Sequence, residues 1–230
     1  GTGVMLGAGL EILIEATHGN PKQWMFNSVE TARGSTVAYL GMGADRIYLF
    51  NYMDLPGAGS FDPRMGGSAV DRQNYRELLT TIGELETAMK LPRRHIVTYH
   101  DITAPGVRIG DILPLKCRPA VSPGKFEFQD TRILTGPISE NSEVTLVIGT
   151  DSEDMLDGSD FLVYLNGIPC KFEGIVELPK PRPSCKTYKF KLENHFKLPG
   201  ASIVEIASAK RFFGVEWIEI SVDMSLKKGF

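Results

Sequence analysis

The stretch TARGSTVAYLGMGADRIYLFNYMD, Thr31–Asp54, decides the fold that this sequence predicts. Its first half places apolar residues at helical spacing and is broken by two glycines, which predicts a helix over residues 28–42. A continuous apolar run then predicts a strand over Arg46–Phe50, and because it follows a helix we expect a parallel strand buried on both faces. The carboxyl end of such a strand is where α/β proteins collect binding and catalytic groups. In this sequence the polar residues at that end are Asn51, Tyr52 and Asp54.

The composition is that of a globular protein of 230 residues, with 42% hydrophobic and 23% charged residues. The formal net charge is −3 and the lysines and arginines are scattered, which argues against a nucleic-acid or anionic-membrane partner. No apolar run approaches the roughly 20 residues that a helix needs to cross a bilayer. Enzymes, binding modules and structural domains remain as candidate classes.

The sequence shows no pattern of metal ligands or cofactor-binding glycines. The three cysteines, Cys117, Cys170 and Cys185, are too widely spaced for a zinc site or a disulfide framework. They are either buried free thiols or include one bridge between Cys170 and Cys185. The N-terminal glycines do not form the G-x-G-x-x-G fingerprint of a dinucleotide site. The acidic segment 151–160 lacks the EF-hand order of ligands, so we expect a solvated loop, with calcium binding as the alternative. We predict no metal and no cofactor.

The chain divides into two parts of different texture. Residues 1–103 read as strand, helix, strand and helix, and the second helix is expected over residues 71–82, where apolar residues recur at i, i+3, i+4 and i+7. Residues 112–226 hold short segments of alternating polarity separated by turn residues such as Asn166-Gly167. That pattern is typical of an antiparallel β-sandwich, here jelly-roll-like. The predicted class is therefore α+β: a partial (β/α)-barrel-like N-terminal segment followed by an antiparallel β-sandwich.

Three motifs in the first part resemble one protein family. They are Gly9-Leu10-Glu11, the segment ETARG from Glu30 to Gly34, and the segment GADRIYLFNY from Gly43 to Tyr52. Together they resemble the last quarter of a family of bacterial TIM-barrel proteins that are similar to glycoside hydrolases. The resemblance implies that residues 1–103 are the C-terminal portion of a (β/α)8 barrel and that residues 112–226 are a β-sandwich accessory domain. It also implies a carbohydrate ligand.

The same resemblance implies a catalytic role for Glu11, near the carboxyl end of the first expected strand. Glycoside hydrolysis commonly needs two carboxyl groups, and the second would come from an earlier barrel strand that this chain lacks. We therefore expect the chain alone to be inactive as a hydrolase. The alternative for Glu11 is a structural acid that pairs with Arg33 or Arg46.

Four residues are predicted to bind the substrate: Asn51, Tyr52, Asp54 and Trp24. The first three can form hydrogen bonds to sugar hydroxyls, and Tyr52 or Trp24 offers an aromatic surface for stacking. The alternative is that they are strand-end and loop residues that satisfy backbone groups, and for Trp24 this structural role is the favoured interpretation.

Three functions fit these observations. The leading one is a piece of a glycoside-hydrolase-like protein, the second a non-catalytic module that binds a glycan, and the third a purely structural domain. Two parallel strands cannot close a barrel and leave open edges, so self-association through the incomplete barrel is also expected. A binding module would expose aromatic side chains of its sandwich. The candidates are Trp217, Phe212, Phe213 and Tyr164.

Overall fold

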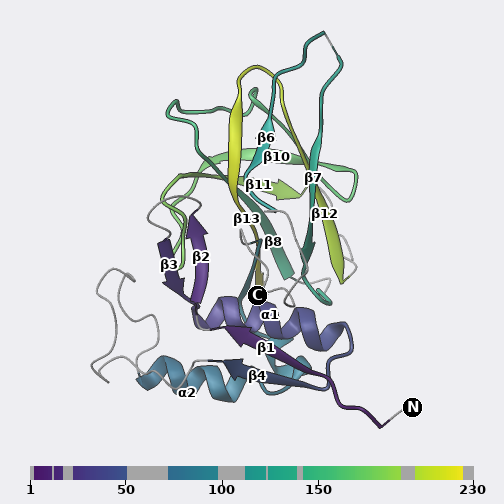
Figure 1. Ribbon diagram of the computed structural model, residues 1–230, viewed down its shortest axis with the longest axis vertical. Helices are drawn as coiled ribbons and strands as arrows, with labels where there is room; N and C mark the ends of the chain where they lie inside the picture. The colour runs from purple at the N-terminus through teal and green to yellow at the C-terminus, as the bar shows by residue number, and fades with distance from the viewer. Residues whose placement is uncertain are drawn as a thin grey trace, which may run out of the picture.

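The computed structural model describes residues 3–11, 13–17, 23–50, 72–97, 112–122, 124–138, 142–192 and 200–224. Figure 1 shows a barrel-like sheet above the helix α1, with the strands β1 and β4 at the lower end of the molecule. The elements are β1 (Gly7–Glu11), β2 (Leu13–Thr17), β3 (Gln23–Phe26), α1 (Val29–Gly41), β4 (Arg46–Phe50), α2 (Arg72–Thr81), α3 (Leu85–Met89), β5 (Arg93–Val97), β6 (Leu115–Cys117), β7 (Gln129–Leu134), β8 (Ser142–Thr150), β9 (Phe161–Leu165), β10 (Ile168–Ile175), β11 (Lys186–Leu192), β12 (Ala201–Ser208) and β13 (Phe213–Met224).

Nine of the described strands form one antiparallel sheet that curls into a nearly closed barrel. The strand order is β5-β13-β8-β11-β10-β9-β12-β7, and β6 also pairs with β13. The edge strands β5 and β7 lie against each other, so the two ends of the sheet meet. The antiparallel β-rich character expected for the second half is confirmed.

The predicted fold class, a partial (β/α) barrel followed by a β-sandwich, is wrong, because the described part of the chain is mostly antiparallel β. The strand β5 shows the physical reason. It lies within residues 1–103, which were expected to form part of a (β/α) barrel, but it pairs antiparallel with β13 from Val97↔Ile218 to Arg93↔Val222. It therefore belongs to the same sheet as the strands of the second half.

A continuous apolar core fills the barrel. Alternation in strands such as β9, FLVYL, sends every second side chain inward. Aromatic rings occupy the middle of this core. The ring centroid of Phe161 lies 5.1–5.9 Å from those of Phe172, Tyr188, Phe190 and Phe213. The turn Asn166-Gly167 joins β9 to β10 with both residues at positive φ, as a two-residue hairpin loop requires.

The N-terminal unit contains the parallel pair β1–β4, with α1 between the two strands in the chain. Ser28 caps α1, because its side chain accepts a hydrogen bond from the Thr31 N–H while the Thr31 hydroxyl accepts one from the Ser28 N–H. Leu10, Ile47 and Leu49 pack against α1 and α2. The helices α1 and α2 and the strand β4 lie within one or two residues of their predicted bounds.

Strand β4 is not buried on both faces, so that part of the prediction is wrong. Its residues alternate between exposed and half-buried along the whole strand. In the described part of the chain, helices cover one face of the β1–β4 pair. The other face is the one described in the next section.

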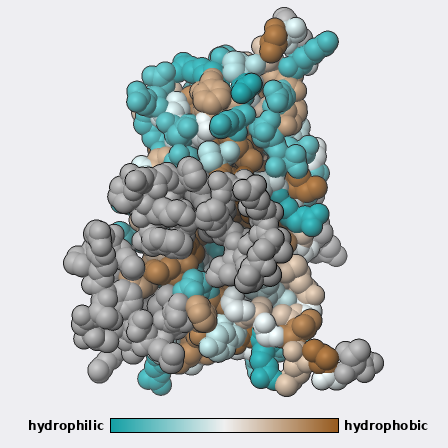
Figure 2. All heavy atoms as spheres, in the orientation of Figure 1, coloured by the Kyte–Doolittle hydropathy of each residue, from teal (hydrophilic) through white to brown (hydrophobic). Residues whose placement is uncertain are grey.

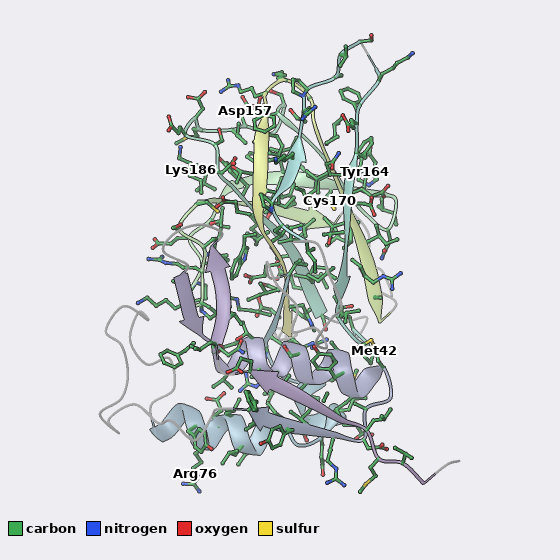
Figure 3. All side chains as sticks on the ribbon, viewed as in Figure 1. Met42, Arg76, Asp157, Tyr164, Cys170 and Lys186 are labelled. Carbon is green, nitrogen blue, oxygen red and sulfur yellow. The ribbon has the colours of Figure 1, made fainter. Side chains whose placement is uncertain are left out.

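The helix α1 packs directly on β5, at the lower end of the barrel (Figure 1). Gly34 permits this contact, because a Cβ at this position would lie 2.0 Å from the carbonyl oxygen of Arg94 in β5. Gly136, at φ +60°, approaches α1 in the same way, since its Cβ would lie 2.3 Å from the Val37 carbonyl oxygen. The label of Met42 in Figure 3 marks the carboxyl end of α1 beside the lower edge of the barrel. Backbone-to-backbone packing therefore joins the N-terminal unit to the barrel.

The hairpin β2–β3 was not predicted. It lies beside the barrel (Figure 1), where Ile14 and Met25 pack against Trp217 and Leu178 on the outside of the sheet. Trp217 is only 1% exposed. It belongs to the core and cannot serve as the exposed sandwich aromatic that a glycan-binding module needs.

Candidate functional site

The outward face of the β1–β4 pair is the candidate site. The strands are parallel and in register, with Gly7 opposite Arg46, Gly9 opposite Tyr48 and Glu11 opposite Phe50. Paired residues on adjacent strands share a face of the sheet. The helix-covered face carries the alternate residues, which include Leu10, Ile47 and Leu49. The outward face therefore consists of Gly7, Gly9, Glu11, Arg46, Tyr48 and Phe50.

Two aromatic rings form the centre of this face. Tyr48 is 59% exposed and Phe50 is 47% exposed. Their ring centroids lie 6.3 Å apart and the ring planes are inclined by 48°. Sheets of parallel strands are usually covered on both faces, so an open face with two aromatic rings is a candidate for contact with a ligand or partner. In Figure 2 the lower part of the molecule, where β1 and β4 lie, shows hydrophobic, near-neutral and hydrophilic residues side by side at the surface.

The strand β1 leaves room beside the rings. A Cβ placed on Gly9, the neighbour of Tyr48, would meet no atom within 4 Å. A Cβ on Gly7 would meet only the side chain of Arg46, at 3.5 Å from Cγ. Because β1 has glycines at these two positions, the Tyr48 ring and the Arg46 side chain have no side chain beside them on that strand.

Charged residues lie at the two ends of the face. Arg46 is exposed and donates to Met5 Sδ. Its end of the sheet is fixed by Asp45, whose carboxylate accepts a hydrogen bond from the Leu6 N–H at 2.7 Å. At the other end, the backbone carbonyl of Glu11 accepts a hydrogen bond from the Asn27 side chain. The sheet therefore presents a cation at one end and a half-buried carboxylate at the other.

The structure places Glu11 at the carboxyl end of β1, where the sequence suggested a functional acid. The alternative pairing of Glu11 with Arg33 is not seen, since the Arg33 guanidinium pairs with Glu77 and also donates to the Thr81 hydroxyl. Asn51, Tyr52 and Asp54 lie outside the described residues. Trp24 lies in β3, and its side chain is also outside the described part.

Sequence reasoning missed Arg46, Tyr48 and Phe50 as surface residues. The run RIYLF reads as continuously apolar after its first residue, which suggested burial on both faces. A finer signal is present, because the aliphatic residues Ile47 and Leu49 alternate with Arg46, Tyr48 and Phe50. Alternation of this kind separates a helix-packed face from an open one.

The acids that border the sheet are not placed as a hydrolytic pair. Asp45 lies beside Leu6, five residues before Glu11 along β1, which corresponds to roughly 16 Å of extended strand. Glycosidase carboxyl groups lie about 5 to 9.5 Å apart. Glu11 and Asp45 therefore cannot act together on one glycosidic bond.

Among the four sandwich candidates only Phe212 is exposed, while Tyr164 lies against the exposed ring of Phe128. Phe213 is buried with Trp217, and Tyr164 is half-buried and packs edge-on against Phe128, with centroids 5.5 Å apart. Phe212 is 55% exposed. Figure 3 places Tyr164 on the side of the barrel and Asp157 near its upper end, both away from β1 and β4.

The acidic loop between β8 and β9 is held by contacts within the protein. The Asp157 carboxylate accepts a hydrogen bond from the Ser159 N–H at 2.7 Å. The hydrogen bonds that the side chain and the backbone of Ser159 donate lower the pKa of Asp157. The Arg211 guanidinium lies 3.4 Å from the Asp160 carboxylate. Among the described residues, no group of three or more His, Cys, Asp or Glu is arranged to hold a metal ion. All three cysteines are free thiols in this structure.

Two buried polar groups lie where α1 and the hairpin β2–β3 meet the barrel. The Glu219 carboxylate accepts hydrogen bonds from the Arg94 guanidinium at 2.7 Å, and from the Trp217 indole at 3.0 Å. His95 lies on the next position of β5, and neither imidazole nitrogen has a hydrogen-bond partner in the described structure. Burial, with help from the charge of Arg93, lowers the pKa of His95 to about 3, although the nearby Leu134 backbone offsets part of this effect. These groups are inaccessible, so their role is structural.

Comparison with models of known protein families finds no match for this chain, and comparison with curated proteins finds none. The described helices include none that is long and apolar enough to span a bilayer. The resemblance to glycoside-hydrolase-like proteins stays a prediction from the quoted motifs. The candidate site must therefore be judged on its geometry.

Proposed function

We propose that this chain is a non-catalytic carbohydrate-binding protein and that it holds a saccharide on the outward face of β1 and β4. The observation that carries the proposal is the exposure of Tyr48 and Phe50, with Gly9 opposite the Tyr48 ring so that β1 carries no side chain at that position. An aromatic ring offers a flat apolar surface to the C–H groups of a sugar, and the Tyr48 hydroxyl adds a polar tip for its hydroxyl groups.

The charges on this face favour a polar ligand over a permanently buried protein interface. The cores of protein interfaces are depleted of charged residues. This face has Arg46 and Glu11 at its two ends. Arg46 lies two residues before Tyr48 on β4, and Glu11 lies directly opposite Phe50. Sugars accept and donate hydrogen bonds around an apolar middle, which is the same arrangement of groups that this face presents.

The proposal leaves catalysis out because the described residues of β1 and β4 do not bring two carboxyl groups together. Glu11 and Asp45 lie at opposite ends of β1 and β4. Hydrolysis by a larger protein of which this chain is a piece stays a prediction. Asn51, Tyr52 and Asp54 follow Phe50 directly in the sequence and stay the predicted hydrogen-bonding groups for the saccharide.

Isothermal titration with a panel of hexasaccharides, both neutral and acidic, tests this function. We expect at least one to bind, and Tyr48→Ala to weaken binding about tenfold, which corresponds to the loss of one aromatic contact. Phe212→Ala is the matched control, because it removes another exposed aromatic ring at the far end of the barrel. Absence of binding to the whole panel, or equal affinity of Tyr48→Ala and the unchanged protein, overturns the proposal.

Light scattering separates this function from self-association. If the face is instead covered by a second copy of the chain, the unchanged protein is a dimer and Tyr48→Ala shifts it to the monomer. A monomer that binds a saccharide through Tyr48 supports the proposal, and a dimer that binds none contradicts it.

A further inference from the structure

We infer that the saccharide bound by the β1–β4 face is acidic, a linear chain containing uronic acid residues with one carboxylate on Arg46. This inference rests on the proposed function and adds the chemical class of the ligand. It is carried by the position of Arg46 on the same face and the same strand as the two aromatic rings.

The spacing along β4 suits successive units of a chain. Residues on one face of a strand repeat about every 6.8 Å, and the Tyr48 and Phe50 ring centroids are 6.3 Å apart. These distances are comparable to the length of one pyranose unit. A chain stacked on Tyr48 and running along β4 therefore places its next unit over Arg46.

Arg46 has the charge and the accessibility for this role. Its side chain is exposed and donates a hydrogen bond to the sulfur of Met5. The neighbouring Asp45 carboxylate accepts a hydrogen bond from the Leu6 N–H, and no ion pair joins it to Arg46 in the described part of the chain. Other arginines of the chain, Arg33 and Arg94, are instead buried against carboxylates of the protein itself.

The chemistry of the guanidinium group selects a carboxylate. Its planar arrangement of N–H donors binds both oxygens of a carboxylate at once, which a neutral hydroxymethyl group cannot match. Arg46 lies at the amino end of β4, so it fixes the position of the ligand's carboxylate at that end of the face.

The test compares hexagalacturonate with its fully methyl-esterified form, two probes that share stereochemistry and differ in charge. We expect the acid to bind about fivefold more tightly at low salt, as for one well-placed exposed ion pair. The difference should shrink as salt is added and disappear in Arg46→Gln. Arg132→Gln is the matched control, because Arg132 is an exposed arginine on the strand β7 of the barrel.

The outcomes separate this inference from the proposed function. If the two probes bind equally and Arg46→Gln changes neither affinity while Tyr48→Ala weakens both, the acidic preference is overturned and the carbohydrate-binding function stands. If neither probe nor any neutral hexasaccharide binds, both are overturned. Loss of the acidic preference in Arg132→Gln instead of Arg46→Gln also contradicts the inference, because it places the carboxylate on the barrel.

Discussion

The substitution Gly34→Ala tests the packing of α1 on the barrel. An ideal Cβ at this position lies 2.0 Å from the carbonyl oxygen of Arg94, whereas real Cβ contacts below 3.0 Å are essentially never seen. The helix and the strand β5 must therefore move apart by about 1 Å. The obstructing atom belongs to the backbone of a buried strand, so rotation of a side chain cannot relieve the clash.

The magnitude follows from two opposing terms. Overpacking that forces a backbone shift costs about 3 kcal/mol, at the upper end of the usual range, and alanine gains about 1 kcal/mol over glycine within a helix. The net loss is about 2 kcal/mol, which lowers the Tm of a chain of this size by about 4 to 8 °C.

Differential scanning calorimetry of Gly34→Ala beside Gly83→Ala measures the effect. Gly83 is the control, because a Cβ there meets no atom within 4 Å and its φ is not positive. We expect Gly83→Ala to change the free energy of unfolding by less than about 0.5 kcal/mol. Equal Tm values for Gly34→Ala and the unchanged protein would refute the described contact between α1 and β5.

Three further predictions concern the interior. Glu219→Gln leaves the buried Arg94 guanidinium without its charged partner, so we expect a loss of about 3 to 5 kcal/mol in urea unfolding; a loss below about 1 kcal/mol would contradict this. The folded protein holds His95 neutral with a pKa of about 3, below the ordinary 6.5. The unfolded chain therefore binds the extra proton, and stability falls by about 1.4 kcal/mol per pH unit between about pH 6.5 and about pH 3. In His95→Leu this part of the loss should be absent. Equal slopes of unfolding free energy against pH in His95→Leu and in the unchanged protein would overturn the assignment. Burial raises the pKa of each of the three cysteine thiols to about 12, so a thiol reagent at pH 8 should modify them slowly until the protein is unfolded; immediate reaction of all three would count against it.

The local elements of the N-terminal unit were predictable because their signals are local. The helix α1 ends at glycines and the strand β4 begins at Arg46, as the sequence indicated. The pairing of β5 was not predictable in this way. Its first three residues, Arg93, Arg94 and His95, are basic, and their burial depends on groups far along the chain, such as the carboxylate of Glu219. Hydrophobic periodicity carries no information about such a distant partner.

The candidate site was predicted in part. The carboxyl end of β1, with Glu11, was identified from its place in the expected strand. The open face was missed because an apolar run does not reveal by itself which of its two faces is covered. Tyr48 and Phe50 are exposed because α1 and α2 pack on the other face alone, and that follows from tertiary structure.

The central claim is that the outward face of β1 and β4 is a binding surface for a saccharide. The most direct test is NMR of the aromatic ring protons during titration with the saccharide that binds most tightly in the panel of neutral and acidic hexasaccharides. We predict chemical-shift changes at the rings of Tyr48 and Phe50 that saturate with ligand, while the ring of Phe212 is unchanged. Unchanged Tyr48 and Phe50 resonances at saturating ligand, or changes confined to rings of the barrel, would contradict the claim.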